Sequence, residues 1–212
     1  MNFLAHCALA QEACKRWQGT PELQGGLLAG AIFADFAKGP VSSSIPVALQ
    51  AGIRLHRRID AYSNTHETIR EICASFPTEL RRFAPIFVDI LSDYYLSRSW
   101  GDYYEESRVV LSARVYAACN EHISSLDKPQ SVSIARFTQY MQETDLLANY
   151  HQWRHVERGL HSVLGRLGKS ELFDEVVASA KAQGNSGESA FRIYFGDMQN
   201  QLPQWISIIA TK

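Results

Sequence analysis

The chain has 212 residues, enough for one large domain or two small ones, and no stretch is typical of an interdomain linker. We therefore predict a single domain over residues 1–212. Hydrophobic residues make up 46% of the chain, which supplies a sizeable core. The formal net charge of -1 excludes a global attraction to nucleic acid or anionic membranes, so a charged partner needs a local patch.

The four cysteines have no spacing typical of a zinc site, and we expect them to be reduced core residues. The N-terminus lacks the basic and apolar regions of a signal peptide. The longest apolar run, residues 25–34, is too short to cross a bilayer. We therefore expect a cytoplasmic protein with no membrane or nucleic-acid partner.

Helical periodicity runs through almost the whole chain, and strictly alternating strand-like runs are absent, which predicts an all-α domain of about eight to ten helices. The first half predicts helices over residues 2–16, 20–38 and 46–62, with a loop at 42–44. Asn64 or Thr65 is expected to cap a short helix that ends at Ser75. The next helix is expected to be kinked or started by Pro85 and to end near Trp100.

The second half continues the helical pattern. We predict a helix over residues 106–124, a loop at 127–131, and helices over 133–167 that are interrupted near Asn149. Residues 170–182 and 188–209 are also expected to be helical, separated by a turn at 184–187 and perturbed at Pro203.

Two pairs of polar side chains recur at a spacing of four residues. His56 and Asp60 form the first pair, and Asp89 and Asp93 form the second. On a helix, this spacing places both members on one face. Each pair alone has an ordinary alternative: an intrahelical ion pair on a solvated face for the first, and surface carboxylates for the second. Two such pairs in one helical domain favour a shared metal site.

Two further candidates lie in apolar surroundings. His6 occurs on the first predicted helix, where a lone histidine is more often a satisfied core residue than a ligand. Asp35 follows a run of eight apolar residues and either lies at the surface or requires a cation or several donors. Gly25, Gly26 and Gly30 cost helix stability, which is worthwhile if another helix approaches closely there.

Arginines beside the first pair suggest a phosphate site. Arg57 and Arg58 are suited to bidentate recognition of phosphate. With three further arginines, they form the best-clustered basic patch in the sequence: Arg54, Arg57, Arg58, Arg81 and Arg82. By contrast, His151 and His155 have no glutamate between them and are expected to lie on an exposed polar face.

Four sequence blocks together resemble the acyl carrier protein phosphodiesterase family. They are Met1–His6, Ala34–Gly39, Leu55–Asp60, and the stretch from Ala84 to Trp100. The resemblance covers about the first hundred residues well. It implies an all-helical, HD-phosphohydrolase-like fold and a metal-dependent hydrolase that removes the 4′-phosphopantetheine group from holo acyl carrier protein. Manganese is the metal that the resemblance implies, with Mg²⁺ as the alternative.

The resemblance also implies roles for individual residues. We expect His6, Asp35, His56 and Asp89 to be metal ligands. Arg57, Arg58, Asp60 and Asp93 are expected to serve catalysis, the arginines at the phosphate and the carboxylates in proton transfer.

The chain departs from the family pattern at three positions, where Ala8, Tyr94 and Ser99 stand in place of frequent histidines. Two alternatives therefore stay open: an HD-type hydrolase of another phosphoester, and a non-catalytic member that binds an acidic protein. The sequence does not predict an oligomeric state.

Overall fold

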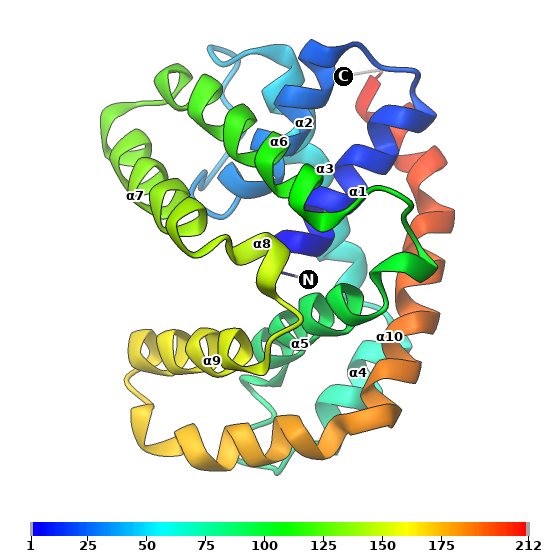
Figure 1. Cartoon of the computed structure of the whole chain (residues 1–212), viewed down its shortest axis with the longest axis vertical. Coiled ribbons are helices and arrows are strands. Elements are labelled where there is room, and N and C mark those ends of the chain that lie inside the picture. Colours follow the sequence, from blue (N-terminus) through cyan, green and yellow to red (C-terminus); the bar gives the residue numbers. More distant parts are fainter. Residues whose placement is uncertain (1, 211–212) are drawn as a thin grey trace.

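The computed structural model describes residues 2–210, and helices are the only regular elements in this part of the chain. The prediction of an all-α domain is confirmed (Figure 1). Ten α-helices and three short 3₁₀ turns follow one another between residues 3 and 210: α1 (Phe3–Arg16), α2 (Pro21–Phe33), α3 (Val47–Ser63), α4 (Glu67–Ser75), α5 (Ala84–Arg98), η1 (Trp100–Asp102), α6 (Arg108–His122), η2 (Ile123–Ser125), α7 (Lys128–Thr144), α8 (Leu146–Asn149), α9 (Trp153–Leu167), η3 (Ser170–Leu172) and α10 (Phe173–Ala210).

The helices are arranged around α1, which contacts α2, α3, α5, α6 and α10. Helices α6 and α7 lie at one end of the molecule, and α9 lies at the other with the first part of α10 (Figure 1). Helix α10 bends at Gly184, whose positive φ of 41° is readily adopted only by glycine. The turn predicted at 184–187 is thus reduced to a kink. Beyond it, α10 runs along α5, α4, α1 and α3 (Figure 1).

Three predicted boundaries are wrong. Helix α2 ends at Phe33 and not at Lys38, because a turn closes at Phe36 and Ala37, whose N–H groups both donate to the Phe33 carbonyl. Thr65 caps no helix, because its hydroxyl donates back to carbonyls of the preceding turn. Helix α7 begins at Lys128, inside the predicted loop, because a proline in the first turn is compatible with a helix start.

Helices α2 and α3 approach each other through glycines, which confirms the prediction for Gly26 and Gly30. For Gly25 the prediction is wrong, because a Cβ atom there would meet only His122 Nε2, at 3.6 Å. A Cβ atom on Gly30 would lie 2.5 Å from the carbonyl carbon of Gly52, and one on Gly26 would lie 2.4 Å from Ala48. Any side chain at these positions would push the two helices apart. The glycines therefore set how closely α3, which carries His56 and Asp60, lies to α2.

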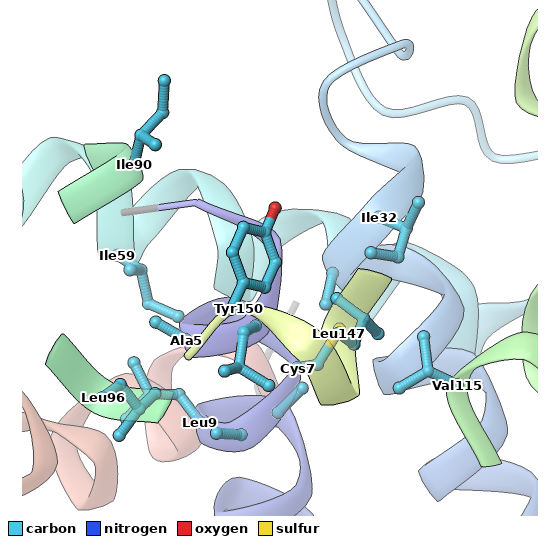
Figure 2. Packing of buried hydrophobic residues seen from close by; sticks show 14 of the residues in the cluster. Ala5, Cys7, Leu9, Ile32, Ile59, Ile90, Leu96, Val115, Leu147 and Tyr150 are labelled. Carbon is cyan, nitrogen blue, oxygen red and sulfur yellow. The ribbon is translucent and has the colours of Figure 1, made fainter. Parts of the chain in front are cut away.

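The hydrophobic core surrounds α1. Ala5 and Leu9 of this helix lie among Ile59 of α3, Leu96 of α5 and Leu147 of α8 (Figure 2). These side chains are almost completely buried. The core thereby fixes α1, α3 and α5 relative to one another. Helix α1 carries His6, α3 carries His56, and α5 carries Asp89 and Asp93.

Candidate metal centre and substrate cleft

Three side chains from two helices converge on one point. His6 of α1 and His56 of α3 stack their rings in parallel, with centroids 3.7 Å apart and an interplanar angle of 8°. Asp60, one turn after His56, bridges them. Its Oδ1 lies 3.1 Å from His6 Nε2, and its Oδ2 lies 3.1 Å from His56 Nε2. Ligand atoms of the three residues all lie within 4.8 Å of one another, so this triad can hold a metal ion.

The orientation of His56 is fixed by α2. Its Nδ1 lies 2.8 Å from the carbonyl oxygen of Ala31, which accepts a hydrogen bond and so places a proton on Nδ1. Nε2 then faces Asp60 and also Asp35, whose Oδ1 is 3.6 Å away. A neutral His56 would point a lone pair at two carboxylates. The arrangement therefore requires a cation there, either a second proton on His56 or a metal ion.

The charges of the triad are strongly coupled. Burial disfavours the charged form of His56, but hydrogen bonds to Asp35 and Asp60 outweigh it and raise its pKa to about 9. Burial and the neighbouring His56 lower the pKa of His6 to about 4. Hydrogen bonds from both imidazoles hold the pKa of the Asp60 carboxyl well below its usual range, although burial acts in the opposite direction. An ionised Asp60 thus lies between one charged and one neutral imidazole.

Two further carboxylates lie near the triad. Asp35 occupies the turn after α2, and nearly half of its side chain is exposed. Asp89, on α5, has a raised pKa, because burial and the negative charges of Asp60 and Asp35 disfavour its ionised form. Three carboxylates close enough to influence one another are a typical environment for a divalent cation with oxygen ligands.

These carboxylates line a cleft with a volume of about 820 Å³. Residues of α5, α7 and α9 line it, among them Ile86, Phe137 and Arg158. Asp35, Asp60 and Asp89 are among its lining residues, and so are His155, Arg158 and Arg166 of α9. Apolar side chains cover much of the remaining wall: Phe3, Phe36, Ile86, Ile90, Phe137 and Val163.

Asp93 takes a different position from the one predicted for a catalytic carboxylate. It is completely buried, and its two oxygens accept hydrogen bonds from the backbone N–H groups of Leu4 and Ala5, at 2.8 and 2.9 Å. These groups lie in the first turn of α1, which has unsatisfied donors and a positive dipole. Burial raises the pKa of Asp93 to about 7, although the backbone N–H groups oppose this. Asp93 anchors the helix that carries His6.

The arginines expected at the phosphate do not line the cleft. Arg57 donates to the carbonyl oxygens of Ala37 and Gly39 and so holds the loop that follows Asp35. Arg58 is exposed and lines a separate small cavity with Trp205 at the other side of α3. Their catalytic role stays a prediction that this placement does not favour.

The sequence prediction missed the contribution of α9. His155 was expected on an exposed face but is only 6% exposed and lines the cleft, so that prediction is wrong. His151 lies before the start of α9, so the helical spacing that would place both histidines on one face does not apply. A usable signal was available in the i,i+4,i+8 series Arg158, Ser162 and Arg166, which lies on one helical face.

Comparison with known families identifies the family of this chain. The family model described as acyl carrier protein phosphodiesterase matches residues 1–198. The chain belongs to the acyl carrier protein phosphodiesterase family. All six candidate ligand and carboxylate positions fall within the matched region: His6, Asp35, His56, Asp60, Asp89 and Asp93.

Relatives in this family come from Escherichia coli. Acyl carrier protein phosphodiesterases of strains E24377A, HS and K12 are each 40% identical to this chain over 100 residues. That stretch covers 47% of this chain and 46% of each relative, so the match spans about half the length of the relatives. No solved structure matches the chain. Among the described residues, no helix is both long and apolar enough to span a bilayer.

Proposed function

We propose that this protein is a metal-dependent phosphoric diester hydrolase that removes the 4′-phosphopantetheine group from holo acyl carrier protein and yields the apo form. One observation supports this most strongly. Asp60, the carboxylate that bridges two buried imidazoles in a cluster that requires a cation, lines a cleft that arginines also line. Family membership adds the substrate class.

The residues present fit a divalent cation. His6, His56 and Asp60 would hold it, with Asp35, 3.6 Å from His56 Nε2, as a further oxygen donor. Imidazole combined with carboxylates, and no cysteine in the cluster, suits Mn²⁺ or Mg²⁺ better than a thiolate-seeking metal. When bound, such an ion polarises the phosphodiester and lowers the pKa of water.

The hydrolysis would then need one attack by water and one proton transfer. Water attacks phosphorus, the bond from phosphorus to the serine oxygen of the carrier breaks, and that oxygen takes up a proton. Asp89 faces the cleft with a raised pKa, which suits a group that accepts the proton of water and returns it. Asp93, with both oxygens engaged by α1, would position His6 and not exchange protons with substrate.

The apolar part of the cleft suits the rest of the substrate. Phosphopantetheine is a long arm with methyl and methylene groups between its amides. Phe3, Phe36 and Phe137 form a ring cluster in which the Phe137 centroid lies 4.7 Å from that of Phe3 and 5.5 Å from that of Phe36, and all three line the cleft. This cluster offers an apolar surface beside the carboxylates, along which such an arm would lie.

The test is conversion of holo acyl carrier protein measured by intact-mass spectrometry. We expect loss of the phosphopantetheine group with Mn²⁺ and no loss after chelation, with conversion restored by added Mn²⁺. Cleavage of a generic aryl phosphodiester, but not of the holo carrier, would instead indicate another hydrolase with the same site. Neither activity in folded, metal-supplemented protein would contradict the proposal and favour a binding role.

A further inference from the structure

Helix α9 presents one polar and basic face to the cleft. His155, Arg158, Ser162 and Arg166 all line it, as do Asp35, Asp60 and Asp89. Gly159 lies between them and faces α5, where a Cβ atom would be 3.4 Å from Ile90. Helix α9 packs against α5, which also carries Asp89. The basic face and the carboxylates therefore border the same volume.

The two arginines of this face are not used by the fold. Within residues 2–210, neither Arg158 nor Arg166 forms an ion pair or a side-chain hydrogen bond, in contrast to Arg57 and Arg114. The nearest acid in the sequence, Glu157, accepts instead from Trp153 and pairs with Lys181. Arginines directed into a cleft without a protein anion are available to an anionic ligand.

His155 provides an independent observation. Its side chain is more than nine-tenths buried, and neither ring nitrogen has a hydrogen-bond partner within the described part of the chain. Leaving a buried polar group without a partner is costly, so a ligand that enters the cleft would satisfy it. Burial and the nearby positive charges of Arg154 and Arg158 lower its pKa, so the ring is neutral at pH 7 and offers an N–H donor.

We propose that Arg158 and His155 bind the phosphodiester anion of the substrate, and that Arg166 extends this anion-binding wall toward the cleft mouth. Arg158 would donate its guanidinium fork to the non-bridging oxygens, and His155 would donate one N–H from the buried end of the wall. The identity of the anion rests on the function proposed above. The anion would thus lie between α9 and the metal-binding triad, with no contribution from Arg57 or Arg58.

The first experiment uses inorganic phosphate as the probe, measured by equilibrium dialysis against Mn²⁺-loaded protein. Arg158→Gln should weaken phosphate binding by about 10- to 100-fold, because a charge-assisted bidentate contact is lost. Arg158→Lys should fall between that variant and the wild type, because it keeps the charge without the fork. Arg154→Gln is the matched control, since Arg154 lies on the same helix but does not line the cleft, and it should change binding less than about twofold.

His155→Phe separates binding from folding. Phenylalanine keeps the ring and its packing but removes both unsatisfied nitrogens, so thermal stability should stay the same or rise while phosphate binding weakens severalfold. A fall in stability with unchanged phosphate affinity would show a purely structural role and overturn the assignment of His155.

Conversion of holo carrier is measured on the same variants. If the wild type converts it and Arg158→Gln retains both wild-type phosphate affinity and wild-type KM, the anion-binding wall is refuted while the proposed function stands. If phosphate binding depends on Arg158 but the wild type converts no holo carrier, the anion-binding wall is supported and the proposed substrate is wrong. No phosphate binding to the wild type would overturn the anion-binding wall outright.

Discussion

Replacing Gly30 with alanine should damage the metal centre although Gly30 is not part of it. The added Cβ atom would lie 2.5–2.6 Å from the backbone of Gly52 and Ile53, whereas carbon atoms at ordinary contact are about 3.5 Å apart or more. Because the obstacle is backbone, no side chain can rotate away. Relief therefore requires α2 and α3 to separate by about 1 Å.

Two measurable consequences follow. Overpacking costs about 1–3 kcal/mol, and the better helix propensity of alanine offsets up to about 1 kcal/mol of it, so we expect a net loss of about 1 kcal/mol in the free energy of unfolding. Separation also breaks the 2.8 Å hydrogen bond from His56 Nδ1 to the Ala31 carbonyl. Loss of such an orienting partner reduces metal affinity by about 10- to 100-fold.

Urea unfolding and Mn²⁺ titration of the same preparations check both values. Gly196→Ala is the matched control, because Gly196 is also helical and a Cβ atom there meets nothing within 4 Å. It should leave Mn²⁺ affinity unchanged and raise stability by up to about 1 kcal/mol. Wild-type stability and wild-type affinity in Gly30→Ala would refute the idea that the close α2–α3 contact orients His56.

Three further predictions test other parts of the site. Asp93→Asn should lower the free energy of unfolding by about 2–3 kcal/mol, because its amide donor opposes backbone N–H groups, and no change on urea unfolding would rule out an anchoring role. In metal-free protein, the raised pKa of His56 stabilises the fold fully below pH 6.5, and this contribution is lost as the pH rises through about 9. Denaturation at a series of pH values should show stability falling over that window, with a flatter profile in His56→Gln; equal profiles would contradict the charged pair with Asp35 and Asp60. Arg57→Ala should speed proteolysis of residues 34–46 and leave phosphate affinity unchanged, and a tenfold loss of affinity would return Arg57 to the phosphate.

The parts of this account that sequence alone could predict are local. Helical periodicity identified the fold class, and the four-residue spacing of His56 and Asp60 predicted a pair that the structure shows as an ion pair at 3.1 Å. Their meeting with His6 was suggested only by the family resemblance. His6 and His56 are 50 positions apart, and their stacking depends on how α1 and α3 pack.

The sequence could not predict which face of each helix lines the cleft. Arg57 and Arg58 are adjacent to His56, yet one holds a loop and the other lies at a separate cavity. Arg158 is about 100 positions away in the chain and yet lines the cleft, because α9 packs on α5. Residues that are adjacent to His56 in the sequence therefore lie outside the cleft, whereas a distant residue lines it.

The three departures from the family pattern do not remove any cleft-lining residue. Ala8 is buried in the core, Tyr94 packs edge-on against Trp153, and Ser99 donates to Glu188. None of the three lines the cleft. These positions therefore leave the triad and the basic face of α9 intact, which favours a working site.

The most direct test of the metal centre is Mn²⁺ binding measured by the electron paramagnetic resonance signal of the free ion during titration. Wild-type protein should bind Mn²⁺, and Asp60→Asn should lose at least about tenfold in affinity, because the carboxylate shared by both imidazoles is gone. The control is Asp197→Asn, which alters another histidine–aspartate pair, with His66, outside the cleft. It should bind as the wild type does. Equal Mn²⁺ affinity in all three proteins would contradict the assignment of His6, His56 and Asp60 as the metal centre.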